Sequence, residues 1–399
     1  MITYGVFFSL LNLMDNVAGI KVVIIFDSFK GCMDSQSAGN AAALGVLDAC
    51  PNAHVDVIYM ADGGEGTLEA IRYATGCQYI TCDAHDALLR PVNTGFLWDA
   101  DGNTAYVELA SSCGLPLLDD SESHVMKTTT YGFGECVKAA IEHGACSIIC
   151  TLGGSATNDL GLGALQALGL RVFTKDRIIS HPICGADLAD ITDFNTEFLD
   201  EIKQKCHISF MYDACIPLTG PYGAVNLYAP QKGASAEDLI KLENGVKHVQ
   251  DIISKCTGIS PSEIKGTGAA GGTGYGLGAF LGAKQLSGAD TILDICGFND
   301  RIKNADYILT GEGRCDKQTM QGKAAEAIRR RAAHYQVPVF LLAGSVADRE
   351  ELIKAGFADV IDINAGKPSE INPMLESVAT SRLRMAARSL IEITCGKRK

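Results

Sequence analysis

The chain has almost no clustered positive charge, and this excludes two classes of partner. The net charge is −13, and basic runs are short, such as the terminal Gly-Lys-Arg-Lys. Nucleic acids and anionic membranes are bound mainly through clustered Lys and Arg, so neither is expected as a partner. An anionic small substrate meets the same overall repulsion, and its site must therefore gather cations locally. Cations in or beside glycine-rich loops are the candidates: Lys30, Lys232, Arg314, Lys317 and Lys323. The alternative for each is a solvated surface side chain.

Two further motifs are missing. No G-x-x-x-x-G-K-[ST] sequence occurs, so a P-loop ATPase is excluded and any nucleotide must be held differently. The 15 cysteines are scattered, without a C-x-x-C pair or zinc-type spacing. An odd number of scattered cysteines favours reduced, structural thiols in a reducing compartment.

No apolar segment reaches the length of a membrane span. Residues 1–19 contain an apolar stretch, but no basic residue precedes it and the stretch is short, so a signal peptide is not predicted. We expect these residues to be a non-core extension, with Met14 as an alternative start. A cytoplasmic location is the corresponding expectation.

What the sequence has in abundance is glycine, and the 43 glycines gather in loops. Six loops combine glycine with ionisable or hydroxyl side chains: residues 27–31, 61–67, 153–159, 268–274, 310–316 and 321–323. Glycine allows close backbone approach to a ligand, and a following helix adds the positive end of its dipole. Such loops suit phosphate oxygens, and their carboxylates suit hydrated Mg²⁺. The pattern predicts handling of a nucleoside triphosphate.

The hydrophobic pattern predicts an α/β protein of two domains. Buried strands alternate with helices at both ends of the chain, which indicates parallel sheets. The segments Arg90–Trp98 and Thr104–Leu109 flank Asp101-Gly102 and predict a hairpin. We therefore expect a discontinuous Rossmann-like or flavodoxin-like domain from residues 20–85 and 286–399, with a mixed α/β domain inserted as residues 86–285. Residues 175–200 are expected to be irregular.

Three side chains are the predicted catalytic residues. Asp62 follows a buried strand and precedes two glycines, which favours a base or Mg²⁺ ligand at the carboxyl edge of a sheet; the alternative is a helix N-cap. Lys30 would hold a carboxylate or the transferred phosphate, or else form a surface ion pair. Arg314 can grip phosphate or carboxylate with two parallel hydrogen bonds.

The loops also supply the predicted binding and metal residues. Ser155 and Thr157 offer hydroxyl groups beside an anion nest, and Asn158 offers an amide. The substrate- or phosphate-binding set is Asp27, Ser28, Gly63, Gly64, Gly153, Gly154, Ser155, Thr157, Asn158, Asp213, Lys232, Gly271, Gly272, Thr310, Gly311, Gly313 and Lys323. The metal set is Glu65, Glu312 and Asp316, although Glu65 also suits the first turn of a helix.

From about Lys21 to Leu390 the chain resembles the type I glycerate kinases. The motifs in family order are Asp-Ser-Phe-Lys-Gly at 27–31, Ala-Asp-Gly-Gly-Glu-Gly-Thr at 61–67, Gly-Gly-Ser-Ala-Thr-Asn-Asp at 153–159, Pro-Gln-Lys-Gly-Ala at 230–234, Gly-Ala-Ala-Gly-Gly at 268–272, Thr-Gly-Glu-Gly-Arg at 310–314 and Gly-Lys at 322–323. The resemblance implies the glycerate kinase I fold and phosphorylation of D-glycerate with ATP and Mg²⁺, giving 2-phosphoglycerate. The chain departs from the family at Ile216, where relatives have Asn, and at Phe26, where they more often have Pro.

Two other functions compete with this interpretation. Residues 266–271 fit the dinucleotide motif G-x-G-x-x-G, with Asp290 about twenty residues later, but the polar residues 260–265 predict no strand before it. An NAD-linked oxidoreductase is therefore disfavoured. A sugar-acid sensor without turnover would be indicated by loss of Asp62 or Arg314, and both are present. The oligomeric state is left open, with a homodimer as one option.

Overall fold

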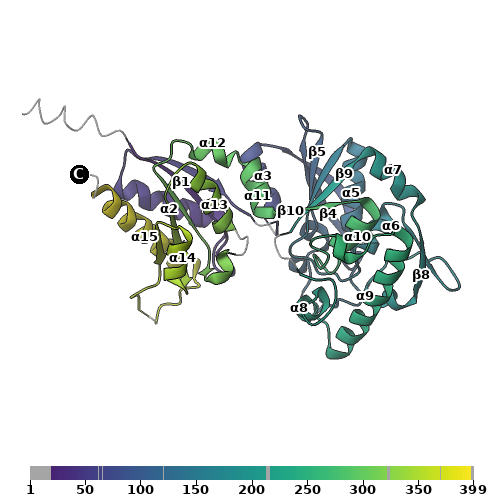
Figure 1. Cartoon of the computed structure of the whole chain (residues 1–399). Helices are drawn as coiled ribbons and strands as arrows, with labels where there is room; N and C mark the ends of the chain where they lie inside the picture. The colour runs from purple at the N-terminus through teal and green to yellow at the C-terminus, as the bar shows by residue number, and fades with distance from the viewer. Residues whose placement is uncertain are drawn as a thin grey trace, which may run out of the picture. The chain divides into compact units, whose positions relative to one another are not determined.

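A computed structural model describes residues 19–61, 63–64, 66–119, 121–212, 216–320, 324–368 and 370–396. The chain divides into two compact units (Figure 1). The first unit comprises Met1–Met60 and Gly297–Lys399, and the second comprises Ala61–Cys296. In the described residues, no helix is both long and apolar enough to cross a membrane.

The first unit is built on a five-stranded parallel sheet. Its order is β15-β13-β11-β1-β2, which is the 2-1-3-4-5 order of flavodoxin-like sheets. The central strands β1, β11 and β13 are mostly apolar, and all their residues except Lys21 are buried, as expected when helices cover both faces of a sheet. The strand bounds are β1 Lys21–Phe26, β2 His54–Tyr59, β11 Tyr307–Gly311, β13 Val339–Ala343 and β15 Asp359–Asp362.

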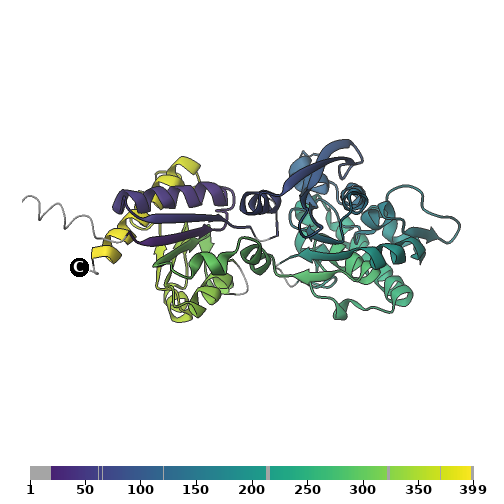
Figure 2. The same cartoon turned by 90° about the horizontal axis from the view of Figure 1, so that it is seen from above.

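Helices cover both faces of this sheet (Figure 2). Helix α2 begins after Asp34, whose carboxylate caps it by accepting a hydrogen bond from the Ser37 N–H at 2.6 Å. Apolar residues of α2 and α15 share one core with β1 and β11, and α13 contacts β11 and β13. Two short strands, two shorter helices and a 3-10 helix complete the described part of this unit. The bounds are α2 Ser35–Ala49, α12 Phe298–Ile302, α13 Ala324–His334, α14 Arg349–Ala355, α15 Glu376–Gly396, β12 Arg314–Cys315, β14 Ser345–Val346 and the 3-10 helix η5 Lys317–Met320.

The second unit contains a six-stranded mixed sheet. Its order is β10-β9-β6-β5-β4-β3, with β5, β6, β9 and β10 parallel and β3 and β4 antiparallel. The pairing of β4 with β5 confirms the predicted hairpin. The strand bounds are β3 Gln78–His85, β4 Pro91–Asp99, β5 Thr104–Glu108, β6 Ser147–Thr151, β9 His207–Met211, β10 Lys284–Leu286, and, in a separate pair, β7 Arg171–Thr174 and β8 Ile191–Asn195.

Helix α10 (Thr273–Leu281) is buried at every position in this unit. Its glycines allow that packing: a Cβ atom on Gly276 would lie 2.0 Å from the Leu160 carbonyl oxygen. The other helices are α3 Thr67–Thr75, α4 Ala110–Cys113, α5 Tyr131–His143, α6 Leu162–Ala167, α7 Glu197–Lys205, α8 Ala224–Tyr228, α9 Ala236–Thr257 and α11 Gly288–Ile295, with 3-10 helices η1 Leu115–Leu117, η2 Gly185–Asp190, η3 Pro230–Lys232 and η4 Pro261–Glu263.

The observed division differs from the predicted domain boundaries. Residues 61–85 and 286–296 group with the second unit, because β3 pairs along its whole length with β4 and because α3 packs against α11 and β5. The stretch 175–200 was wrongly expected to be irregular, since β8 pairs there with β7 and α7 begins at Glu197. The predicted extension falls on residues outside the described part of the chain, except for Gly19, which lies against the Asn52 carbonyl.

Candidate functional site

Three of the predicted glycine loops meet in the second unit. Strand β6 ends at Thr151, and the Gly153 N–H donates to the Gly63 carbonyl at 3.1 Å. A Cβ atom on Gly153 would lie 2.3 Å from the Gly64 Cα atom, so the two loops touch through their backbones. Gly63 in turn lies against Met211, the last residue of β9. The loops therefore gather at the carboxyl ends of parallel strands, where α/β proteins bind ligands.

The loop before α10 completes this group. A Cβ atom on Gly271 would lie 2.2 Å from the Thr157 carbonyl oxygen, and the Leu160 N–H donates to the Gly271 carbonyl at 3.2 Å. Gly271 and Gly272 both have positive φ angles, +63° and +92°, which glycine adopts without strain. Glycine at 271 is thus required by close contact as well as by backbone conformation.

Lys232 reaches into the loop Gly153–Asp159 from the 3-10 helix η3. Its Nζ atom donates to the Ser155 hydroxyl at 2.8 Å and to the Thr157 carbonyl at 2.7 Å. The residue is only 3% exposed, so the alternative of a solvated surface lysine is wrong for this position. Burial lowers the pKa of Lys232 to about 7, against the opposing effect of the Asp159 charge.

Asp159 anchors the other end of the loop. Its side chain accepts from the Thr130 N–H at 2.8 Å, the Thr130 hydroxyl at 2.7 Å and the Gly161 and Gly163 N–H groups at 3.1 and 3.2 Å. Burial raises the pKa of the Asp159 carboxyl, and these hydrogen bonds oppose the increase. The sequence-based site set missed Asp159 and Thr130; the run of threonines at 128–130 carried no recognisable signal, because its partner lies 29 residues away.

Two polar side chains of the same loop are buried without a hydrogen-bond partner among the described residues. They are the Thr157 hydroxyl and the Asn158 side chain, which lacks a partner at both Nδ2 and Oδ1. Thr157 and Asn158 are 0% and 1% exposed. An unsatisfied buried polar atom is costly and uncommon, so two adjacent ones indicate groups reserved for a ligand.

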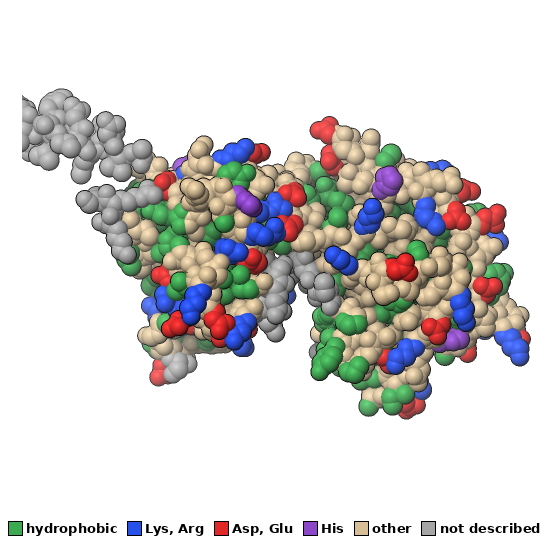
Figure 3. Space-filling view, in the orientation of Figure 1, with side chains coloured by type: hydrophobic (Ala, Val, Ile, Leu, Met, Phe, Trp, Pro, Cys, Tyr) green, Lys and Arg blue, Asp and Glu red, His purple; other side chains and the backbone are tan. Residues whose placement is uncertain are grey.

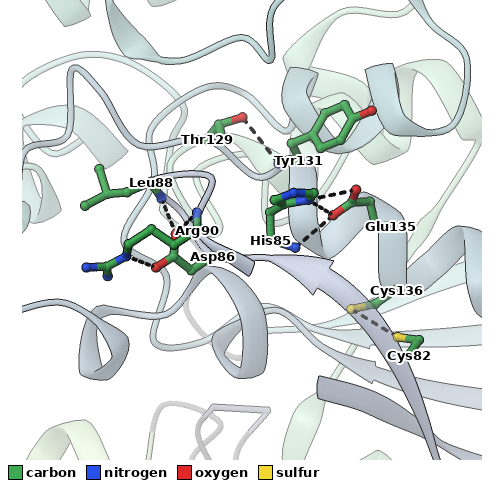
Figure 4. A network of polar contacts seen from close by, with 9 residues as sticks. All are labelled: Cys82, His85, Asp86, Leu88, Arg90, Thr129, Tyr131, Glu135 and Cys136. Carbon is green, nitrogen blue, oxygen red and sulfur yellow. Dashed lines mark hydrogen bonds and ion pairs between the residues drawn. The ribbon is translucent and has the colours of Figure 1, made fainter. Parts of the chain in front are cut away.

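A polar network lies at the start of α5, the helix that directly follows Thr130 (Figure 4). His85 faces Glu135 across this network, with Nδ1 at 3.0 Å from both carboxylate oxygens. Asp86 accepts from the Leu88 N–H, the Arg90 N–H and the Arg90 Nε at 2.8, 2.9 and 2.6 Å. No role was predicted for His85, and the structure gives it a polar contact with Glu135 that ties β3 to α5.

The first unit brings a second group of predicted residues together. The loop Asp27–Gly31 follows β1, and the loop Thr310–Asp316 begins in β11, its neighbour in the sheet. The Asp27 N–H donates to the Gly311 carbonyl at 3.0 Å, and Gly313 lies beside the Lys30 backbone, since a Cβ atom on Gly313 would lie 3.5 Å from the Lys30 nitrogen. In this strand order, the chain leaves β1 and β11 on opposite sides, which is the topological switch point where ligands bind.

Side chains of this group differ in exposure. Arg314 is exposed, with Nε 3.4 Å from an Asp316 carboxylate oxygen, whereas the buried Thr310 hydroxyl has no hydrogen-bond partner in the described part of the chain. Thr319 connects the two predicted metal ligands: its hydroxyl donates to Glu312 at 3.0 Å and accepts from the Asp316 N–H at 3.1 Å. Glu312 and Asp316 are carboxylates, and Mg²⁺ commonly takes one or two such ligands from the protein. Within the described ranges, no three metal-binding side chains are arranged around one point.

Some predicted residues lie outside the described part of the chain. These are Asp62, Glu65, Asp213 and Lys323. The helix that follows these first two residues, α3, has Gly66 at its N-cap position and begins at Thr67. Before the motif at 266–271 the structure has the 3-10 helix η4 and no strand in residues 257–265, which agrees with the rejection of a dinucleotide fold.

Comparisons with known proteins agree with the resemblance seen in the motifs. Residues 22–394 match the model of the glycerate kinase family. Glycerate kinase of Bacillus subtilis is 37% identical over 82% of this chain and 86% of its own, and glycerate 2-kinase of Escherichia coli is 35% identical over the same shares. A crystal structure of a candidate glycerate kinase 2 from Salmonella typhimurium has a TM-score of 0.78 and 30% identity, and the match covers 96% of this chain and all of that one. The predicted α/β fold is confirmed, and the chain belongs to the glycerate kinase family.

Proposed function

We propose that this protein is an ATP-dependent glycerate kinase that transfers the γ-phosphoryl group to D-glycerate and gives 2-phosphoglycerate. The observation that carries the proposal is the loop Gly153–Asp159, where backbone-to-backbone glycine contacts, a buried lysine and two unsatisfied polar side chains meet at the end of β6. Membership of the glycerate kinase family supports phosphoryl transfer as the reaction, and the names of the relatives support glycerate as the substrate.

Phosphoryl transfer requires positioning and neutralisation of charge more than covalent chemistry. In the second unit, the amide of Asn158 and the hydroxyl of Thr157 would bind polar ligand groups. In the first unit, Lys30 and Arg314 would supply cations beside the switch point. Asp62 would take the proton from the attacking hydroxyl group or help to hold Mg²⁺.

Magnesium would be held by Glu312 and Asp316 and would supply charge neutralisation for the phosphate oxygens. The contacts of the Thr319 hydroxyl with the Glu312 carboxylate and with the Asp316 backbone N–H support this assignment. Lys323 would add a further phosphate contact.

A coupled assay tests the proposal. The protein is mixed with ATP, Mg²⁺ and D-glycerate, and ADP release is followed; L-glycerate is the matched control. ADP formation that depends on D-glycerate supports the kinase, while glycerate binding without turnover would instead indicate a sensor and NAD reduction a dehydrogenase. Phosphorus NMR of the product distinguishes 2-phosphoglycerate from 3-phosphoglycerate.

We also propose a cytoplasmic location and assembly as a homodimer. The 14 cysteines of the described residues form no disulfide with one another, which suits a reducing compartment. The surface over α8 and the start of α9 exposes apolar side chains, among them Tyr222, Leu227 and Ile240, and Figure 3 shows hydrophobic atoms gathered there. Light scattering after size exclusion at several concentrations would give the mass; a monomer throughout would remove the dimer.

A further inference from the structure

The ammonium group of Lys232 is engaged by the protein itself. Two of its three N–H donors go to the Ser155 hydroxyl and the Thr157 carbonyl, 77 and 75 residues away in the sequence. Its own backbone is fixed as well, because the Val125 N–H donates to the Lys232 carbonyl at 3.0 Å and the Lys232 N–H donates to the Ala229 carbonyl at 3.0 Å. The lysine therefore has a fixed base and two fixed contacts at its tip.

The loop that it contacts is also held by backbone hydrogen bonds, among them one from the Leu115 N–H to the Gly154 carbonyl at 2.9 Å. Gly154 has a φ of +73°, and the backbone of Ala156 is held by the Cys113 carbonyl and by the Thr128 hydroxyl at 2.9 and 2.8 Å. Lys232 holds the residues on either side of Ala156. Thr157 is directly followed by Asn158, so the contact with the Thr157 carbonyl orients the peptide unit that leads to the unsatisfied amide.

We propose that Lys232 is a positioning residue that holds the loop Gly153–Asp159 in its ligand-binding conformation, and that it is not itself a ligand of the substrate. The consequences for catalysis rest on the proposed function, since the loop is there assigned to ligand binding. Lys232 acts through the groups of Thr157 and Asn158, whose placement it sets.

The charge of Lys232 strengthens both contacts, because hydrogen bonds from an ammonium group are roughly twice as strong as neutral ones. Burial lowers the pKa of this lysine to about 7, so the charge is lost as pH rises through the neutral range. The charged side chain that acts on it is Asp159; the other titratable side chains on adjoining segments are His124, beside Gly233, and Cys113, whose carbonyl binds the loop. We therefore expect the contacts of Lys232 with Ser155 and Thr157 to weaken above pH 7, and activity to fall with them.

The experiment compares the full-length wild type with K232M, K232R and the control K241M. Lys241 is an exposed lysine of the same unit, paired with Glu237 at 2.8 Å. Two quantities are measured: kcat/KM for each substrate, and hydrogen exchange of the amides of residues 153–159 without substrate. If Lys232 holds the loop in place, K232M should lose about 100-fold in kcat/KM, which is the scale of a misplaced binding group. The backbone amides of residues 153–159 should also exchange faster in K232M than in the wild type. K241M should match the wild type in both.

The pH dependence separates a clamp from a merely structural lysine. Wild-type kcat/KM should fall above pH 7, and loop exchange, corrected for its intrinsic pH dependence, should rise there. K232R, which keeps its charge, should restore activity and lose the alkaline decline. If K232M does not fold, the exchange profile of the wild type still decides the question.

Three results would overturn the inference: loop exchange that is unchanged in K232M, loop exchange in the wild type that is independent of pH, or a loss in K232M confined to the KM of one substrate, which would make Lys232 a direct ligand. A wild type without glycerate-dependent ADP formation would refute the proposed function instead, while the exchange measurements would still test the clamp.

Discussion

Replacing the buried Lys232 with methionine should change how the stability of the second unit depends on pH. Methionine has a similar length and no charge, so K232M removes the titrating group while filling most of its volume. In the wild type, the pKa falls from 10.5 in the unfolded chain to about 7 in the folded protein. Between these values the unfolded chain binds more protons, so this group makes the free energy of unfolding rise with pH.

The magnitude follows from the same two pKa values. At roughly 1.4 kcal/mol per pKa unit, the charged lysine costs the folded state about 5 kcal/mol at low pH, where it must carry its proton. Between pH 6 and pH 9, linkage predicts that the wild type gains about 3 kcal/mol relative to K232M. The hydrogen bonds lost in the variant lower its stability by about 1–3 kcal/mol each at all pH values, so the change with pH is the diagnostic quantity.

Urea unfolding at pH 6, 7, 8 and 9 measures this difference. The chain has a single tryptophan, Trp98 of β4, whose fluorescence reports on the unit that contains Lys232. K241M is the matched control: the pKa of Lys241 is raised by Glu237, so its removal should not reproduce the effect. A difference between wild type and K232M that stays constant from pH 6 to pH 9 would refute the lowered pKa and the desolvation argument behind it.

Three further substitutions test other parts of the site. G271A should lower the free energy of unfolding by about 1–3 kcal/mol and reduce kcat/KM, because its Cβ would lie 2.2 Å from the Thr157 carbonyl oxygen. G282A is the control, since Gly282 has a similar φ of +68° but open space around it. Calorimetry of both variants isolates the effect of the clash, and equal losses of stability would contradict it. R314K should raise KM for an anionic substrate, because lysine lacks the planar guanidinium group that forms two parallel hydrogen bonds. Unaltered KM values for both substrates would show that Arg314 does not bind either of them. D62N should lower kcat by about 100-fold or more in steady-state assays, and an unchanged kcat would remove Asp62 from the mechanism.

Much of the fold could be predicted from local pattern. The strands around residues 22–26, 147–151 and 207–212 are short apolar runs bounded by turn residues, and the structure has β1, β6 and β9 there. The segment 191–195 was missed because its strand character depends on pairing with β7, which local sequence does not display. The domain boundary after residue 85 failed for the same reason, since β3 belongs with its partner β4.

The sequence by itself determined the α/β class, the glycine loops that follow buried strands, and the family to which the chain belongs. These depend on hydrophobic periodicity, on glycine spacing and on motif order, which can all be recognised from residues that are close together in the sequence. Only the tertiary structure decided that Lys232 is buried against Ser155 and Thr157, and that Asp159 is held by Thr130. Such contacts join residues 29 to 77 positions apart, and they arise because packing excludes water from polar groups and forces them to find partners.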